Sequence, residues 1–400
     1  MIPFEEAFHK VMSHLPVLGT EQIPLTLATG RILAEAVATD RDLPPFDRVT
    51  MDGICICFQA YDAGQRAFRI AGEARAGSPG AQLADADCCL EVMTGAVLPM
   101  GADTVIRYED LKIESGVAHI SGAVKKGQHI HPKGSDAPKG TQLLSPGTRI
   151  GPAEVSTLAS VGKAKVSVHG LPRTTVVSTG DELVEVDQKP LPHQIRRSNV
   201  YALQSALKHL GIDPVLRHLP DRPDRIREGL ERALGESDAL IISGGVSMGK
   251  YDFLPQILEE LGVEKYFHRV AQKPGKPFWF GTHRGSGCGV FSLPGNPVST
   301  FLNYHLYFRE WVWRACGKTG EPSRVILGEP LQNPGPLTVF KLGRVVQREA
   351  ELRAIPVAMN SSGDFSSLSQ ADGFIRLEPG QALYPEGSNR PFLFFNNFGM

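Results

Sequence analysis

Several loops of this sequence carry glycines, lysines or carboxylates at spacings that suit phosphate or metal chemistry. The most distinctive is Ser243-Gly-Gly-Val-Ser-Met-Gly249, which is followed by Lys250, Tyr251 and Asp252 at a predicted helix start. Glycines let backbone N–H groups approach an oxyanion closely, and the N-terminus of a helix adds partial positive charge. We interpret this segment as a phosphate or oxyanion loop. The simpler alternative is a tight turn between a strand and a helix that binds no ligand.

The same segment nearly matches the Walker A pattern of nucleotide hydrolases. Gly244, four further residues, Gly249 and Lys250 fit that pattern, but Tyr251 stands where it requires Ser or Thr. That hydroxyl is the group that binds Mg²⁺ in a P-loop. A P-loop-like hydrolase therefore remains only as an alternative function.

Carboxylates follow or precede other predicted elements of the same region. Thr179-Gly-Asp-Glu182 comes directly after a predicted strand, and Asp221 stands just before a helix that Pro223 begins. Carboxylates at a strand end bind Mg²⁺ or act as general bases. The simpler alternatives are solvated acids on a turn and, for Asp221, a helix N-cap.

Two proline-rich loops complete the set. Lys273-Pro-Gly-Lys276-Pro277 places two lysines on a stiffened loop, which suits a phosphate clamp but also an ordinary basic turn. In Leu293-Pro-Gly-Asn-Pro297, two prolines flank Gly-Asn and fix the shape of the backbone at a place where the ring or phosphate of a ligand can lie. Met51-Asp52-Gly53 and Met93-Thr-Gly-Ala96 are turn segments with no decisive chemistry of their own.

The elements that must position these loops alternate between strand and helix from Arg173 onward. Asn199 and Gly211 are expected to cap and end one of the helices. This alternation predicts a doubly wound, mainly parallel sheet, whose ligands bind beyond the carboxyl ends of the strands. We predict strands over 174–178, 214–219, 239–242, 277–281 and 289–293, and helices over 200–210, 223–234, 253–261 and 298–316.

The rest of the chain has a different texture. A helix is expected over 4–15, short β elements between Gly/Pro turns over 23–150, a helix over 154–161, a strand over 164–168, and a small β domain after Gly320.

The composition argues against nucleic acid or membrane partners and against secretion. The 400 residues carry a formal net charge of -1, which gives no long-range attraction to nucleic acid or an anionic membrane. We find no signal peptide and no apolar stretch of roughly 20 residues. Six cysteines without a C-x-x-C pair predict reduced thiols. The sequence therefore predicts a cytoplasmic protein.

Taken together, the segments resemble the molybdopterin molybdotransferase family, which is related to the gephyrin E domain. The resemblance is ordered and covers nearly the whole chain. It rests on PPFDRVTMDG, AGEARAGSPG, MTGAVLPMGADTV, KGSDAPKGTQLLSPGTRI, VVSTGDELV, SGGVSMGKYDF, QKPGKPFWFG, SLPGNPVSTF and SSGDFSSLSQADGFIRL.

The resemblance implies a multi-domain fold of α/β and β parts. A central doubly wound molybdopterin-binding α/β domain would occupy 171–318, and a C-terminal β barrel 319–400. A linker domain would take 1–22, 46–57 and 131–170, and a β-rich lobe inserted in it 23–45 and 58–130. Family members are homodimers whose active site lies between subunits, which would bring Asp52 and Thr94 to the α/β domain.

It also implies an activity and residues for it. The family inserts molybdate into adenylylated molybdopterin and releases AMP, with Mg²⁺ screening the anions. Matched by motif or position, the catalytic acids are Asp52, Glu182, Asp221 and Asp252, of which the last three would bind Mg²⁺. The substrate-binding residues would be Thr94, Asp136, Thr179, Gly180, Asp181, Ser243, Gly244, Gly245, Ser247, Gly249, Lys273, Gly275, Lys276, Pro294, Gly295 and Asn296.

The sequence departs from the family pattern at several positions. Ile54 and Cys55 follow MDG where an aromatic is usual, Pro132 lies where arginines often precede Gly-Ser-Asp136, and Pro336 replaces a basic residue, with Lys341 nearby. Two other functions of this fold remain open: a scaffold without turnover, and the adenylyltransferase of the preceding step. Expected partners are a second copy of the chain, that adenylyltransferase and molybdoenzyme maturation proteins.

Overall fold

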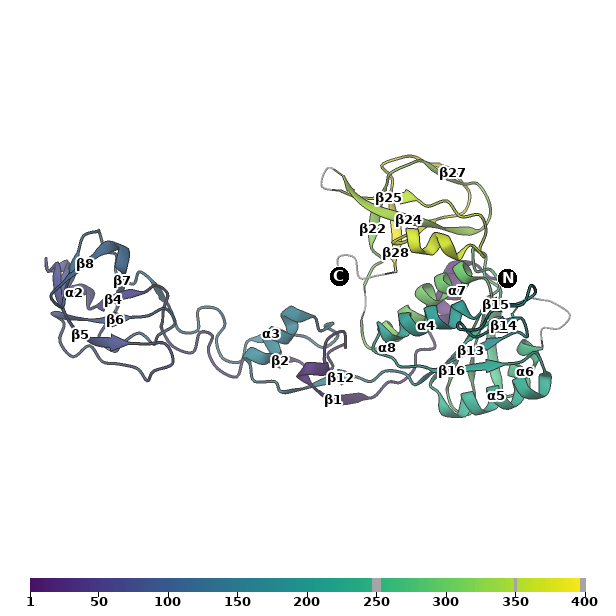
Figure 1. The fold of residues 1–400 in the computed structure, drawn as a ribbon, viewed down its shortest axis with the longest axis horizontal. Helices are drawn as coiled ribbons and strands as arrows, with labels where there is room; N and C mark the ends of the chain where they lie inside the picture. Colours follow the sequence, from purple (N-terminus) through teal and green to yellow (C-terminus); the bar gives the residue numbers. More distant parts are fainter. Residues whose placement is uncertain (247–252, 319, 349–350, 396–400) are drawn as a thin grey trace. The chain divides into compact units, whose positions relative to one another are not determined.

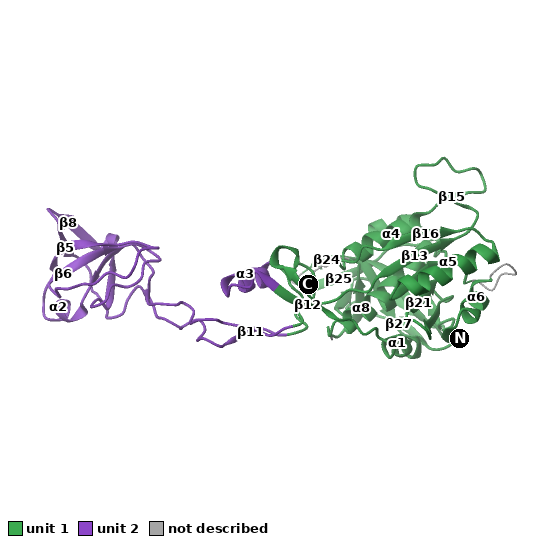
Figure 2. Ribbon diagram, turned by 90° about the horizontal axis from the view of Figure 1, so that it is seen from below, with its two compact units in different colours: residues 1–34, 146–151, 166–400 green, residues 35–145, 152–165 purple. Residues whose placement is uncertain are grey.

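A computed structural model describes residues 1–246, 253–318, 320–348 and 351–395. The chain forms two compact units (Figures 1 and 2). Unit 1 contains residues 1–34, 146–151 and 166–400, and unit 2 contains residues 35–145 and 152–165. None of the described helices is both long and apolar enough to cross a membrane.

A six-stranded sheet in the order β16-β13-β17-β21-β20-β18 forms the centre of unit 1. The first four strands are parallel, and β20 runs antiparallel to both of its neighbours. The predicted doubly wound, mainly parallel sheet is thus confirmed, although its edge strand β18 was not predicted. The strands are β16 (Val215–Leu219), β13 (Thr174–Thr179), β17 (Ala239–Ser243), β21 (Gly289–Leu293), β20 (Trp279–His283) and β18 (Val263–His268).

Helices cover both faces of this sheet, so its strands are buried on both sides. In β17, Ile241 faces one apolar cluster with α4 and α7, whereas Leu240 and Ile242 face a second cluster with α5 and α6. Strands of this kind read as continuous apolar runs. The helices are α4 (Ser198–Lys208), α5 (Pro223–Glu236), α6 (Leu254–Glu260) and α7 (Pro297–Asn303).

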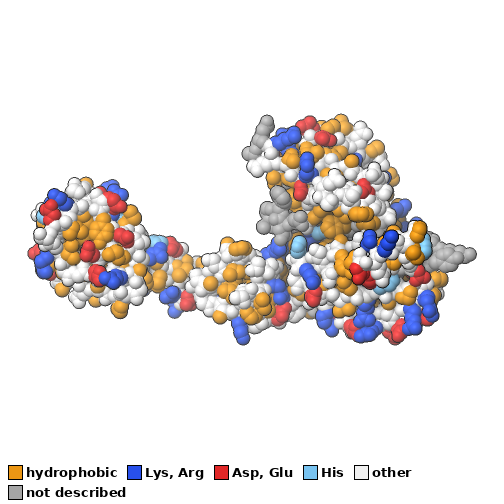
Figure 3. Space-filling model, in the orientation of Figure 1, with side chains coloured by type: hydrophobic (Ala, Val, Ile, Leu, Met, Phe, Trp, Pro, Cys, Tyr) orange, Lys and Arg blue, Asp and Glu red, His pale blue; other side chains and the backbone are white. Residues whose placement is uncertain are grey.

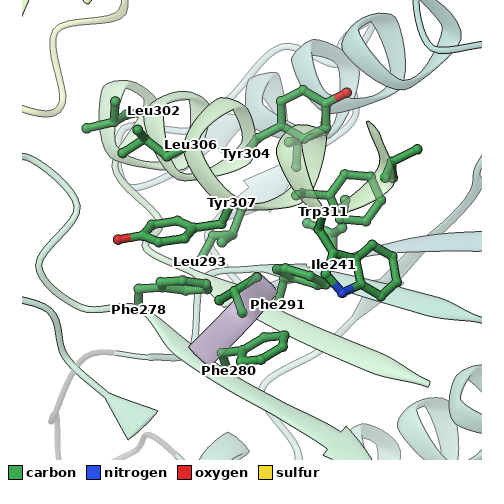
Figure 4. Close-up of a cluster of buried hydrophobic side chains, with 14 of the residues drawn as sticks. Ile241, Phe278, Phe280, Phe291, Leu293, Leu302, Tyr304, Leu306, Tyr307 and Trp311 are labelled. Atoms are coloured by element: carbon green, nitrogen blue, oxygen red, sulfur yellow. The ribbon is translucent and has the colours of Figure 1, made fainter. Parts of the chain in front are cut away.

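The predicted helix over 298–316 is not uniformly α-helical. After α7 the chain forms one π-helical stretch, Tyr304–Phe308, and then α8 (Arg309–Ala315). Figure 4 shows Tyr304, Tyr307 and Trp311 on this segment above Phe278, Phe280 and Phe291 of the loop and strands below. Such a close aromatic cluster excludes water from one face of the sheet.

The C-terminal strands close a five-stranded barrel, which confirms the predicted β barrel. The ring runs β24-β25-β22-β28-β26 and returns from β26 to β24. Its strands are β22 (Arg324–Leu327), β24 (Thr338–Arg348), β25 (Glu351–Pro356), β26 (Gly373–Leu377) and β28 (Asn389–Phe394). Smaller elements of unit 1 are α1 (Phe4–Met12), β1 (Thr20–Pro24), β12 (Lys165–His169), β14 (Leu183–Val184), β15 (Ile195–Arg196), β19 (Gln272–Lys273), β23 (Leu331–Asn333) and β27 (Gln381–Tyr384).

Unit 2 is built on a second six-stranded sheet, in the order β7-β4-β6-β5-β9-β8. Its strand β4 pairs with β6 and β7. The predicted domain boundaries, including the linker-domain segment 46–57, stay predictions. Its strands are β4 (Gly53–Ile56), β5 (Ala67–Ala74), β6 (Cys88–Val92), β7 (Thr104–Arg107), β8 (Leu111–Glu114) and β9 (Val117–Ile120), with β2 (Val37–Ala38), β3 (Arg48–Val49), β10 (Ile130–His131), β11 (Gln142–Leu144), α2 (Phe58–Asp62) and α3 (Pro152–Ser160).

The first position of β4, Gly53, accepts only glycine. A Cβ there would lie 1.9 Å from the carbonyl oxygen of Ile106 on the neighbouring strand. We predict that Gly53→Ala lowers the free energy of unfolding of unit 2 by about 2–3 kcal/mol, as overpacking does. Gly122→Ala is the matched control, because its Cβ would meet only ordinary contacts at 3.8 Å. Equal urea midpoints for the two variants would contradict this reading.

Candidate functional site

The register of three parallel strands brings the candidate loops to one edge of the sheet. Ser178 of β13 pairs with Ser243 of β17, and Ser243 pairs with Leu293 of β21. Thr179 also pairs with Leu219 of β16. The segments that begin at Gly180, Pro220, Gly244 and Pro294 therefore all leave the sheet at its carboxyl edge. This is the edge where open α/β sheets bind ligands.

The glycine loop packs directly against its neighbours. Gly244 donates its N–H to the carbonyl of Leu293 at 3.1 Å. Gly244 and Gly245 have φ angles of +100° and +69°, and a Cβ on either would lie 3.1–3.2 Å from Oγ1 of the buried Thr179. A larger residue would be strained and crowded at both positions. Ser243, Gly244, Gly245 and Thr179 thus lie together, as the site prediction requires.

Asn199 joins the loops across this edge. Its side-chain amide donates to Oγ of Ser243 at 3.0 Å and to the carbonyl of Gly295 at 2.8 Å, and lies 3.3 Å from Oγ1 of Thr300. The prediction that Asn199 caps its helix is therefore wrong: α4 begins one residue earlier, at Ser198, without a side-chain cap. Sequence reasoning found Asn199 but gave its amide a local role, because bonds between loops leave no local signature.

The acidic residues lie on adjacent loops of the same edge. Asp181 accepts the N–H of Asp221 through Oδ1 at 3.1 Å. The carboxylate of Glu182 folds back over Gly180, where a Cβ would lie 2.4 Å from Oε2. Asp181, Glu182 and Asp221 are all exposed. Asp221 is not an N-cap, since that position of α5 belongs to Arg222 and has no side-chain bond.

These acids do not by themselves form a closed metal site. Over the described part of the chain, no three His, Cys, Asp or Glu side chains are grouped closely enough to hold a metal ion. Exposed carboxylates on touching loops still suit Mg²⁺, which keeps several waters and takes phosphate oxygens as further ligands. The predicted site residues Ser247, Gly249 and Asp252, and Lys250 with them, lie outside the described residues.

The loop that carries Lys273 and Lys276 is anchored from below by buried polar groups. The amide of Gln272 donates to Oδ1 of Asn303 at 2.7 Å and to the carbonyl of Pro274 at 3.1 Å. Tyr307 donates its hydroxyl to Oε1 of Gln272 at 2.5 Å. The amide of Asn303 in turn donates to the carbonyl of Gly275 at 3.2 Å.

This loop leaves its two lysines free for an anion. Lys273 and Lys276 are both exposed, and neither forms an ion pair with any residue that the structure describes. Gly275 has a φ of +85°, and a Cβ there would lie 2.6 Å from Oδ1 of Asn303. The network therefore requires glycine at the turn. Gln272, Asn303 and Tyr307 were not found by sequence reasoning, since buried amides resemble ordinary core-facing polar residues.

Two further residues contact the site loops and were not predicted. Ser362, on the connection between β25 and β26, accepts the amide of Asn296 through Oγ at 2.8 Å and the N–H of Val298 through its carbonyl at 3.1 Å. The ring of His268 lies 3.2 Å from the carbonyl of Val246. Burial lowers the pKa of His268. The motif SSGDFSSLSQ was noticed in the sequence, but only as a mark of resemblance.

The candidate residues of unit 2 form their own polar pairs. Asp52 is exposed and accepts the N–H and the hydroxyl of Thr94 through Oδ1, at 2.6 and 2.8 Å. Asp136 pairs with Nε2 of His131 at 2.8 Å, and Arg48 contacts the other ring nitrogen at 2.9 Å. All of these residues belong to unit 2.

The departures after Asp52 are core residues. Ile54 and Cys55 are fully buried within the sheet of unit 2. Burial raises the pKa of the Cys55 thiol to about 12, so it stays protonated and unreactive at neutral pH. All six cysteines are free, which agrees with the expected reduced thiols.

Hydrogen bonds from Thr94 favour the ionised form of Asp52. The backbone N–H of Thr94 and then its hydroxyl lower the pKa of Asp52 from the ordinary 3.8. We expect Thr94→Val to raise this pKa, because one of the two bonds to the charged form is lost. A carboxyl NMR titration measures it. In the parent protein, the ionised Asp52 should stabilise the folded state above the pKa that this group has in the unfolded chain. This stabilisation should be lost as the pH falls through the lower pKa of the folded state.

The control for this titration is Asp42, whose pKa is lowered mainly by the backbone N–H of Lys139 and should not change in the Thr94→Val variant. An unchanged Asp52 titration would contradict the assignment of these bonds.

The hydrogen bonds that anchor the lysine loop lead to a further prediction. Tyr307→Phe leaves Oε1 of the buried Gln272 without its donor, and should lower the free energy of unfolding by about 1–3 kcal/mol. Tyr304→Phe is a close control three residues away. Its buried hydroxyl has no hydrogen-bond partner in the described part of the chain, so its removal should be nearly neutral. Equal losses measured by urea unfolding would contradict the role given to Tyr307.

Models of known families cover most of the chain. Residues 2–162 match the MoeA N-terminal region (domain I and II). Residues 175–312 match a probable molybdopterin binding domain, and residues 324–395 match the MoeA C-terminal region (domain IV).

Curated relatives match over nearly the full length. The molybdopterin molybdenumtransferase of Synechocystis sp. is 39% identical, over 98% of this chain and 99% of its own. Proteins of the same name from Haemophilus influenzae and Bacillus subtilis are 34% and 31% identical, over 94% and 96% of this chain and 95% and 92% of theirs. A crystal structure of a molybdopterin biosynthesis MoeA protein from Pyrococcus horikoshii has a TM-score of 0.82 at 27% identity, over 98% of this chain and 100% of that one.

Proposed function

The chain belongs to the molybdopterin molybdenumtransferase family, and from this premise we propose that it inserts molybdate into adenylylated molybdopterin, giving molybdenum cofactor and AMP. The single observation that carries the proposal is the carboxyl edge of the sheet. There the glycine loop, the acids around Glu182 and the Pro294–Asn296 turn lie on neighbouring strand ends.

Each loop has a task that its chemistry suits. Without Cβ atoms, Gly244 and Gly245 let a phosphate come close to the backbone of this loop, whose shape is held by the bond from the N–H of Gly244 to the carbonyl of Leu293. Lys273 and Lys276 add two exposed positive charges for the pyrophosphate or for molybdate. Asn199 holds the glycine loop and Gly295 at one spacing, so that substrate meets a preformed surface.

Mg²⁺ fits this donor set as the cofactor. Glu182, Asp221 and Asp252 would hold it together with phosphate oxygens, and it would supply charge neutralisation at the pyrophosphate. Asp181 is already occupied by the N–H of Asp221 and serves to join the two loops. The carboxylate of Glu182 remains open to a ligand at the exposed edge.

We expect Glu182→Gln to reduce AMP release at least a hundredfold at saturating Mg²⁺, because an amide cannot replace a carboxylate beside a metal-bound phosphate. Asp187→Asn, an exposed acid on the same connection, should stay within about twofold. The readout is Mg²⁺- and molybdate-dependent AMP release from adenylylated molybdopterin. Activity of the Glu182 variant within a few-fold of the parent would refute the metal-site proposal.

The same assay separates the alternatives. Lys276→Ala should be more damaging than Lys250→Ala, whereas ATP hydrolysis lost only in the Lys250 variant would indicate a P-loop hydrolase. AMP transfer onto molybdopterin without molybdate consumption would indicate the adenylyltransferase of the preceding step. A scaffold would show neither reaction.

We further propose that the enzyme acts in the cytoplasm as a homodimer whose subunits share each site. Support comes from Asp52 and Thr94, which belong to unit 2 but match motifs of the same family as the edge loops. Mixed heterodimers of Asp52→Asn with Glu182→Gln should then recover about a quarter to a half of parental activity, since one of the two sites is intact. Heterodimers without any activity would contradict shared sites.

A further inference from the structure

One cavity of unit 1 lies away from the carboxyl edge of the sheet. It has a volume of about 440 Å³ and opens between α4, the π-helical stretch and Arg149. At α4 it is lined by Ala202, Ser205, Ala206 and His209, toward the end of that helix, whereas Asn199 at its start serves the edge loops. The cavity shares none of the residues proposed for molybdate transfer.

Several buried polar groups around this cavity have no partner among the residues that the structure describes. Within that part of the chain, neither ring nitrogen of His305, nor the hydroxyl of Tyr304, nor Nε of Arg309 has a hydrogen-bond partner. The exposed fractions of these three residues are only 3%, 0% and 7%. Figure 4 shows the hydroxyl of Tyr304 turned away from the aromatic cluster below the helix. Buried donors and acceptors are almost always satisfied in proteins, so these groups point to something that meets them.

Two arginines bring positive charge to the same place. Arg149 and Arg309 line the cavity together with His209 and with His305, whose pKa is lowered well below its ordinary value by burial. Burial lowers the pKa of Arg309, and the nearby Arg149 lowers it further, against the opposing effect of Glu310. Glu310 is a weak counter-charge, because its carboxylate lies 4.0 Å from the guanidinium and burial raises its pKa.

The remaining lining is apolar and aromatic. The ring centroids of Phe301 and Phe395 lie 4.5 and 5.7 Å from that of His305 and 4.8 Å from each other, so the three rings pack together. Trp313 lines the cavity and accepts the guanidinium of Arg309 over its ring at 4.7 Å. A pocket of this volume with an apolar lining and few convergent polar groups suits a small molecule.

We propose that this cavity binds a small organic anion. Its phosphate or carboxylate group meets Arg149 and Arg309, and its apolar part lies against Phe301, Trp313 and Phe395. The guanidinium of Arg149 offers a planar pair of donors to an oxyanion. Arg309 adds its charge, while its Nη1 donates to the carbonyl of Phe394 at 2.7 Å. The hydroxyl of Tyr304 and the neutral ring of His305 supply further polar contacts. The π-helical stretch displaces Tyr304 and His305 from ordinary helical positions, as such stretches often do at functional sites.

The test is calorimetric titration of the full-length protein with phenyl phosphate and, separately, with benzoate. We expect one saturable site of millimolar or better affinity for at least one probe, and the stronger probe identifies the anionic group. Arg149→Gln should weaken binding about tenfold or more. Arg225→Gln, an exposed arginine on α5, and Lys276→Gln, at the proposed transferase site, should leave it unchanged.

A second readout covers the case in which Arg149→Gln fails to fold. In the parent protein labelled at histidine nitrogens, the resonances of His305 should shift on addition of the bound probe, with the same saturation as the heat signal. The proposal is overturned if neither probe binds saturably, as for a cavity filled by water or a second copy of the chain. It is also overturned if binding depends on Lys276 but not Arg149, or if His305 does not respond.

Discussion

Everything at the candidate site depends on the hydrogen-bonded register of β13, β17 and β21. Because Ser178, Ser243 and Leu293 are opposite one another, the residues that follow them leave the sheet side by side. A shift of one residue would move each loop along the edge and exchange the side chains that face the two apolar clusters. The two apolar clusters on the faces of the sheet prevent such a shift, since Ile241 and Ile242 belong to opposite clusters. Packing of the core thus determines the geometry of the site.

On this base, polar side chains connect the loops to one another. Asn199 joins the glycine loop to the turn at Gly295, and Gln272 joins the lysine loop to Asn303 and Tyr307. These groups are buried or half-buried, where an unmet hydrogen bond costs about 1–3 kcal/mol. The lysines and carboxylates that would meet substrate stay exposed. The site therefore combines a rigid polar scaffold with charges that remain free for a ligand.

The sequence predicts the sheet and its loops well because both have local signatures. Continuous apolar runs such as 239–242 mark strands buried on two faces, and Gly244 and Gly245 mark a turn that only glycine adopts. Its predictions fail where a residue acts over a long distance in the chain. Asn199 was expected to cap its own helix, yet its partners are Ser243 and Gly295. Likewise, Gly53 was expected only as a turn residue, yet it begins strand β4, which pairs with β6 and β7.

The central claim is that substrate lies across the carboxyl ends of these strands. Hydrogen–deuterium exchange with and without adenylylated molybdopterin tests it most directly. Binding should slow exchange together in the peptides that contain Thr179–Glu182, Ser243–Val246 and Pro294–Asn296, whose loops lie at one edge. Protection confined to the opposite edge of the sheet, or no protection in these three peptides at saturating substrate, would contradict the account.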